Sequence, residues 1–137
     1  MRAGRVFADR IAVIDGDQRY TYAEFLDRSL RLAGALHTRA LSDGARVAVL
    51  APNTHVLLEA HYGVPLAGAV LVALNPRLTA ADLSAIVAHA GATMLIYDHE
   101  HQATARVIAS ACEGLTLIRA GDEYEAMLAH AQPYYVT

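Results

Sequence analysis

Two histidine-containing groups are the residues of this 137-residue chain best suited to hold a metal ion. His55 and Glu59 stand four positions apart, a spacing that puts both side chains on one helix face within reach of a shared ion. The sequence offers no evident third ligand beside them. Asp98–His101 supplies four possible ligands in succession. Because adjacent side chains point in different directions, we interpret that run as a solvated loop and assign no metal site.

Phosphate binding by a glycine-rich loop is a second possible chemistry. Neither G-x-G-x-x-G nor G-x-x-x-x-G-K-[ST] occurs in the sequence. Gly63 and Gly68 have the glycine spacing of the second pattern, but Ala69 stands where its lysine belongs and the segment is apolar. We therefore interpret the two glycines as residues that let a helix turn tightly into the strand that follows.

Nucleophilic catalysis has no clear candidate in the sequence. No serine stands in a G-x-S-x-G motif. Cys112 lies in Ala-Ser-Ala-Cys on a predicted helix without an adjacent cation, so we interpret it as a small buried thiol. The carboxylates within Asp15–Asp17 and Glu123–Glu125 are explained by turn formation and by the helix dipole. Three histidines are expected to cap helix carboxyl ends, namely His37, His89 and His130.

Composition excludes several functional classes. All 11 basic residues are arginine, so no mechanism can use a lysine of this chain as a Schiff base or phosphate ligand. The arginines are scattered and the net charge is -3, which argues against nucleic-acid binding. The apolar fraction of 55% is high for a small domain. We therefore expect an apolar surface that is covered by a further domain or an oligomer contact.

The sequence also favours a cytoplasmic protein without a membrane span. A single cysteine rules out an intrachain disulfide, which fits a reducing compartment. The charged amino terminus is not followed by the apolar run of a signal peptide. The longest apolar stretch, Val64–Leu74, has 11 residues interrupted by Pro65 and Gly68, too few to cross a bilayer.

Local signals predict a hairpin and then an alternation of strands and helices. Asp15–Gly16 between two β-prone runs is a hairpin signal, and Thr21 with Glu24 has the form of a capping box at a helix start. Along that helix Arg28 falls on the polar face. The predicted strands are 11–14, 19–21, 46–51, 70–74, 93–97 and 115–118, and the predicted helices are 22–39, 54–66, 79–91, 102–112 and 122–130.

This alternation predicts the fold class. Strands of four to six residues between helices of ten to fifteen imply right-handed β-α-β units. We expect an α/β protein with a mostly parallel sheet, helices on both of its faces, and a short β-hairpin in front.

Several segments, in their order, resemble the start of the adenylate-forming, or AMP-binding, superfamily of acyl-CoA synthetases, luciferases and adenylation domains. Arg19–Phe25 is similar to the family's hairpin followed by a T-Y-x-E-L helix. Asp43–Asn53 is similar to G-D-R-V-A-x-x-x-x-N, with the Gly-Asp order reversed. Glu59–Leu78 closely resembles G-x-x-x-x-G-A-V-x-x-P-x-N-x-R-L and looks most like fatty or medium-chain acyl-CoA synthetases. Leu83–Tyr97 continues the likeness, which covers roughly residues 8–128.

The resemblance implies ATP-dependent activation of a carboxylic (fatty) acid to an acyl-adenylate, followed by thioester formation with coenzyme A, with Mg²⁺ at the phosphates. It also implies that residues 1–137 are the amino-terminal part of a larger domain. The family's phosphate loop and carboxyl-terminal domain would lie beyond Thr137. We therefore assign no catalytic, cofactor-binding or metal residue to this chain and expect it to be inactive alone.

A second hypothesis belongs to a different class. The chain could be a stand-alone, non-catalytic α/β module that binds a partner through its apolar face, for example as a homodimer. The motivating observation is the same apolar excess. Both hypotheses remain open on the sequence.

Overall fold

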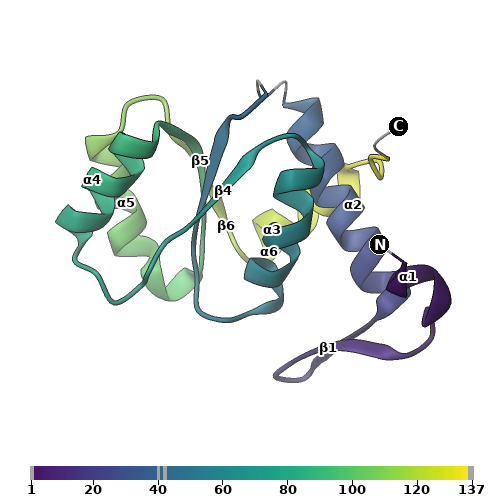
Figure 1. Cartoon of the computed structure of the whole chain (residues 1–137). Helices are drawn as coiled ribbons and strands as arrows, with labels where there is room; N and C mark the ends of the chain where they lie inside the picture. Colours follow the sequence, from purple (N-terminus) through teal and green to yellow (C-terminus); the bar gives the residue numbers. More distant parts are fainter. Residues whose placement is uncertain (1, 40, 42, 136–137) are drawn as a thin grey trace.

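A parallel four-stranded sheet organises the described residues, 2–39, 41 and 43–135, of this computed structural model (Figure 1). The strands lie in the order β4-β3-β5-β6, and every neighbouring pair is parallel. This confirms the predicted α/β class. The strand bounds are β3 Arg46–Leu50, β4 Val70–Ala73, β5 Ala92–Tyr97 and β6 Thr116–Arg119.

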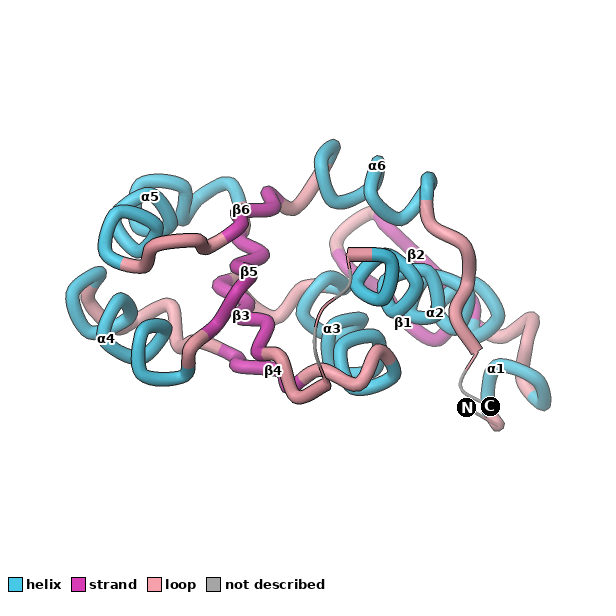
Figure 2. Tube along the Cα trace, turned by 90° about the horizontal axis from the view of Figure 1, so that it is seen from above, coloured by secondary structure: helices cyan, strands magenta, loops and turns pink. Residues whose placement is uncertain are grey.

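Helices cover both faces of this sheet, as predicted. Figure 2 shows α4 and α5 on one face, and α3 and α6 on the other with α2 packed outside them. Each predicted helix is present, with its ends shifted by no more than about one residue. The helix bounds are α1 Ala3–Val6, α2 Tyr22–Thr38, α3 His55–Leu66, α4 Ala80–Ala90, α5 Gln102–Ala111 and α6 Asp122–His130.

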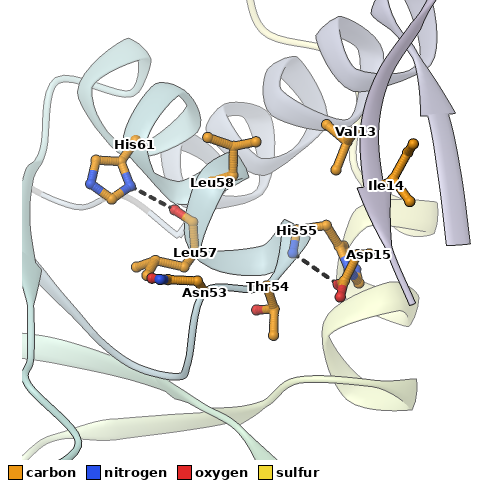
Figure 3. Close-up of a pocket in the computed structure, with 9 residues that line it drawn as sticks. All are labelled: Val13, Ile14, Asp15, Asn53, Thr54, His55, Leu57, Leu58 and His61. Atoms are coloured by element: carbon orange, nitrogen blue, oxygen red, sulfur yellow. Dashed lines mark hydrogen bonds and ion pairs between the residues drawn. The ribbon is translucent and has the colours of Figure 1, made fainter.

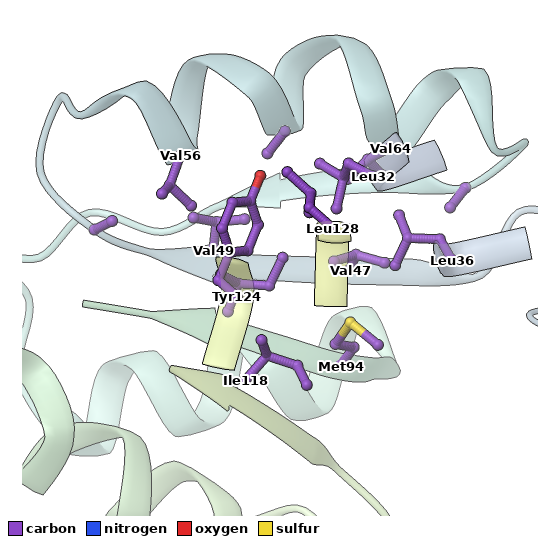
Figure 4. Close-up of a cluster of buried hydrophobic side chains, with 14 residues drawn as sticks. Leu32, Leu36, Val47, Val49, Val56, Val64, Met94, Ile118, Tyr124 and Leu128 are labelled. Carbon is purple, nitrogen blue, oxygen red and sulfur yellow. The ribbon is translucent and has the colours of Figure 1, made fainter. Parts of the chain in front are cut away.

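Two hydrophobic cores lie on the two faces because alternate residues of each strand point to opposite sides. In β3, Val47 and Val49 face α2, α3 and α6, where they join the larger core drawn in Figure 4. Ala48 and Leu50 of the same strand face α4 and α5. All four side chains have an exposed fraction of 0%, so the continuous apolar run does reflect a strand that is covered on both sides.

The hairpin precedes this body and has the predicted form. β1 (Ile11–Asp15) and β2 (Gln18–Thr21) pair antiparallel, and Gly16 takes the left-handed conformation in the turn between them. At the end of β2 the capping box is present in full. Thr21 Oγ1 accepts from the Glu24 N–H at 3.1 Å, and the Glu24 carboxylate accepts from the Thr21 N–H at 2.8 Å.

Of the two glycines expected to turn a helix into the following strand, Gly68 has that role and Gly63 does not. Gly68 follows α3 in the left-handed conformation and allows the turn toward β4. Gly63, however, lies inside α3 rather than at its end. A Cβ atom there would stand 2.7 Å from Leu32 Cδ2 of α2, so this glycine allows close contact of two helices. The short helix α1 is an element that the sequence signals did not indicate.

A second glycine lets the chain after α6 return along α2. Residues 131–135 lie against this helix, where the Tyr134 N–H donates to the Leu30 carbonyl at 3.0 Å and the Tyr134 ring stacks on His37. A Cβ atom on Gly34 would overlap the carbonyl oxygen of Gln132. Close packing of this segment therefore depends on a residue without a side chain.

We predict that Gly34→Ala lowers the free energy of unfolding by about 1–2 kcal/mol, because the steric overlap outweighs the gain of about 1 kcal/mol in helix propensity. Urea denaturation followed by circular dichroism measures the change. Ser110→Ala on the exposed side of α5 is the control that adds helix propensity without a new contact. A Gly34→Ala variant as stable as the unmodified chain would contradict the close-packing role.

Candidate functional site

The most polar feature of the interior is a group of charged and phenolic side chains that we call the Arg28 cluster. It draws on the hairpin and the consecutive helix α2, and on α3 and α6, which lie much further along the sequence. Hydrogen bonds, ion pairs and two contacts of the Tyr20 ring connect the group. Its members are Asp15, Tyr20, Arg28, His55, Glu59, Tyr124 and Glu125.

A fully buried carboxylate lies at the centre of this cluster. Glu59 of α3 has an exposed fraction of 0%. Arg28 Nε donates to Glu59 Oε2 at 2.6 Å, and Arg28 Nη2 donates to Oε1 at 3.2 Å. The Tyr124 hydroxyl donates to the same Oε1 at 2.8 Å. Since an unpaired buried charge is very unfavourable, these three donors are what allow a carboxylate in the core.

Arg28 also holds a second carboxylate. Its two terminal nitrogens donate to the two oxygens of Glu125, at 2.9 and 2.8 Å. The guanidinium lies 4.7 Å from the centre of the Tyr20 ring, a cation–π contact with the hairpin. His55 and Arg28 together hold the pKa of Glu125 at about 2, although partial burial opposes this shift. Arg28 therefore ties α2 to α3, to α6 and to β2 at once.

His55 joins the cluster to the first strand (Figure 3). Both the backbone N–H and Nδ1 of His55 contact Asp15 Oδ2, at 3.0 and 2.6 Å. These two contacts, the backbone one foremost, lower the pKa of Asp15. Burial of the imidazole opposes protonation, but Glu125 and Asp15 outweigh it and raise the pKa of His55 above 6.5. The ring is 11% exposed.

A cavity of about 290 Å³ lies next to this pair, between β1 and α3 (Figure 3). Four of the residues that line it are apolar and five are polar or ionisable. The lining residues are Val13, Ile14, Asp15, Asn53, Thr54, His55, Leu57, Leu58 and His61. The cavity therefore has one wall on the hairpin and one on the α/β body.

The chemistry of the Arg28 cluster is that of an ion-pair network. All four carboxylate oxygens of Glu59 and Glu125 accept a hydrogen bond from Arg28 or Tyr124. Within residues 2–39, 41 and 43–135, no three His, Cys, Asp or Glu side chains gather as a metal site would need. The arrangement orients four elements relative to one another.

The structure fixes the positions of the metal-ligand, thiol and helix-capping candidates named from the sequence. His55 and Glu59 do share one face of α3, but they bind different partners, Asp15 and Arg28. The segment after β5 forms a single 3₁₀ turn, His99–His101. Cys112 ends α5, partly buried, with its Sγ 3.7 Å from the Ser84 carbonyl oxygen. Each of His37, His89 and His130 lies in the last turn of its helix, as expected.

Two interpretations of charged residues need correction. Arg28 was expected on a polar helix face, yet its side chain is only 15% exposed because α3 and α6 pack over it. Asp15 and Glu125 have partners, His55 and Arg28, beyond the turn and helix dipole invoked for them. One signal could have indicated the network. Glu59 is the single acidic residue of α3 and lies among its buried apolar positions Val56, Ala60 and Val64, and such a residue needs a buried counter-ion.

Comparisons with known proteins identify relatives of this chain. Residues 1–135 match the sequence profile of the family described as AMP-binding enzyme. A peroxisomal acetate/butyrate–CoA ligase of Arabidopsis thaliana is 40% identical over 99 residues, which are 72% of this chain and 17% of that protein.

Two solved structures superpose closely on this chain. A benzoate–CoA ligase from Burkholderia xenovorans superposes with a TM-score of 0.90 at 27% identity, over 96% of this chain and 27% of that one. The N-terminal domain of FACL13 from Mycobacterium tuberculosis gives 0.88 at 27% identity, over 98% of this chain and 36% of that domain. The match thus spans about a sixth of the curated relative and about a third of the domain. No helix in the described ranges is long and apolar enough to cross a membrane.

We predict that Arg28→Met lowers the free energy of unfolding by about 3–5 kcal/mol, because it leaves the buried Glu59 carboxylate without a cation. The matched control is Arg31→Met, one helix turn further along α2. Arg31 pairs with Asp27 near the surface and donates to the Ala131 carbonyl, so its loss should cost only about 1 kcal/mol. Urea denaturation of both variants makes the comparison, and equal losses would contradict the central role of Glu59.

Proposed function

Because the chain belongs to the family of AMP-binding enzymes, we propose that it forms the amino-terminal part of the large domain of a CoA ligase. The complete enzyme would activate a carboxylic acid with ATP to an acyl-adenylate and then form the CoA thioester. The observation that carries the proposal is the continuous match over residues 1–135. The similarity of nearly the whole chain to the N-terminal domain of FACL13 supports its place in such an enzyme.

The proposal names a carboxylic acid as the substrate class, fatty acids included. One relative is named for acetate or butyrate and another for benzoate, so the family likeness extends over short aliphatic and aromatic acids. We keep the cytoplasm as the proposed location on the strength of the single cysteine. The Arabidopsis relative is itself described as peroxisomal.

We further propose that the chain is inactive without the rest of the enzyme. Adenylation needs cations and backbone amides placed at the phosphates, where charge develops in the transition state. The sequence holds neither a lysine nor a glycine-rich phosphate loop. No residue of this chain is therefore assigned to bind ATP, Mg²⁺ or CoA, and the chemical steps would be carried out by the rest of the enzyme.

The contribution of this segment would be architectural. Arg28 connects the hairpin to three helices through Tyr20, Glu59 and Glu125. A network of this kind fixes the relative positions of surfaces that other parts of an enzyme can rest on. Removing it should therefore affect the whole enzyme through folding and positioning rather than through chemistry at the acyl group.

A second candidate is a stand-alone interaction module, for example a homodimer. The observation in its favour is a set of exposed apolar side chains on α1 and the hairpin, namely Val6, Phe7, Ile11 and Ile14. Light scattering at micromolar concentration distinguishes the two candidates. A monodisperse dimer with cooperative unfolding favours the module, whereas a loose monomer or soluble aggregates favour a segment of a larger enzyme.

We predict that the isolated chain forms no acyl-CoA from ATP, CoA and a carboxylic acid. Grafted in place of the equivalent segment of the Burkholderia benzoate–CoA ligase, residues 1–135 should instead support benzoyl-CoA formation. Chromatographic detection of the thioester, with AMP release as a second readout, measures both.

The same graft carrying Arg28→Met is the control for architecture, and it should lose thermal stability together with activity. Two results would contradict the proposal. One is acyl-CoA formed by the isolated chain above a no-enzyme blank. The other is a graft that melts cooperatively, as the host enzyme does, yet forms no benzoyl-CoA.

A further inference from the structure

The environment of His55 suits a charged imidazole better than a neutral one. Nδ1 lies 2.6 Å from Asp15 Oδ2, and Nε2 lies 3.7 Å from Glu125 Oε1. Ionised carboxylates only accept hydrogen bonds, so each ring nitrogen faces a group that requires a proton on it. A neutral ring has one N–H and one lone pair, and the lone pair would then face a negative charge. Within the described residues Nε2 has no hydrogen-bond partner of its own.

Every element packed against this ring brings a charged or titratable group. Asp15 comes from β1, Tyr20 from β2 with its ring centre 5.4 Å from the imidazole, and Glu125 from α6. Glu59 on α3 favours the protonated ring, whereas Arg28 on α2 opposes it. Three carboxylates against one guanidinium leave a net negative surrounding, which favours the imidazolium.

The hairpin depends on few anchors to the α/β body. Val13 is its buried apolar side chain, while Ile11 and Ile14 are exposed. Thr21 and Glu24 fix its junction with α2, and beyond that junction its polar anchors are Asp15 on His55 and Tyr20 on Arg28. A two-stranded hairpin alone is only marginally stable in water, so its order follows from docking.

We propose that His55 is a proton-operated latch that holds the β1–β2 hairpin on α3 and α6. With the ring protonated, Asp15 and Glu125 are bridged by one cation and the hairpin is docked. Loss of the proton leaves a lone pair against a carboxylate and weakens the bridge. Because the hairpin forms one wall of the cavity beside α3, the same proton controls how open that cavity is.

The pH window follows from the direction of each shift. The pKa of His55 is raised, so its stabilisation is complete below its ordinary value of 6.5 and is lost as pH rises through the higher folded value. The pKa of Glu125 is lowered to about 2 and that of Asp15 is also lowered, so their stabilisation is lost only at acid pH. Docking is therefore strongest near pH 5 to 6.5 and weakens toward alkaline pH.

Amide hydrogen exchange across pH 5.5–9 tests the latch. Dividing observed rates by intrinsic rates removes the pH dependence of the chemistry itself. We expect protection of amides in residues 11–21 to fall by about tenfold from pH 6 to pH 9, because the protonated ring that bridges Asp15 and Glu125 loses its charge over that range. Protection in β3 and β5 should stay nearly constant over the same range.

Three variants make the test specific. His55→Gln should give weak hairpin protection that no longer changes above pH 6. His61→Gln, on an exposed histidine of the same helix that bonds only to the Leu57 carbonyl, should keep the full pH response. Asp15→Asn should lower the pKa of the His55 ring in an NMR titration.

Several results would overturn the latch. Flat hairpin protection in the unmodified chain is one, and an unchanged pH response in His55→Gln is another. If His55→Gln does not fold, the NMR titration of the unmodified chain decides, since a His55 pKa at or below 6.5 would also refute the proposal. None of these readouts involves ligase activity, so they are independent of the proposed function.

Discussion

A single buried negative charge constrains much of this structure. Glu59 is fully enclosed, and a carboxylate in that position is tolerated only while Arg28 and Tyr124 donate to it. Those donors come from α2 and α6, the two helices that pack around α3 on one face of the sheet. The positions of three helices are therefore linked through one side chain, and the hairpin joins them through Tyr20 and Asp15.

The sheet supplies the hydrophobic burial that the Arg28 cluster does not. Its apolar strands are covered on both faces, and the larger of the two cores lies directly beneath α3 and α6 (Figure 4). Hydrophobic burial gives most of the stabilisation. It does not by itself select one arrangement of the helices, because many apolar packings have similar energies. Charged hydrogen bonds with fixed geometry select one packing among them. Core and network thus have complementary roles in a segment that must present defined surfaces.

The sequence predicted the elements that local signals specify. The hairpin turn at Gly16, the capping box at Thr21 and the helix stop at Gly91 all depend on residues a few positions apart, and each is present. The Arg28 cluster could not be derived in this way. In the sequence, Arg28 has the position of an ordinary residue on a polar helix face. Its partners Glu59 and Glu125 lie 31 and 97 positions away. Only the tertiary fold reveals that pairing.

That long separation also bears on how the chain is made. A ribosome releases α2 and α3 well before it has added Tyr124 and Glu125, so during that interval Glu59 lacks part of its complement of donors. The last link of the network closes across 97 residues, well over half of the 137-residue segment. Contacts that distant form late and slow folding. An emerging chain would therefore stay loosely packed until α6 arrives, and during that interval a chaperone could engage its apolar helices.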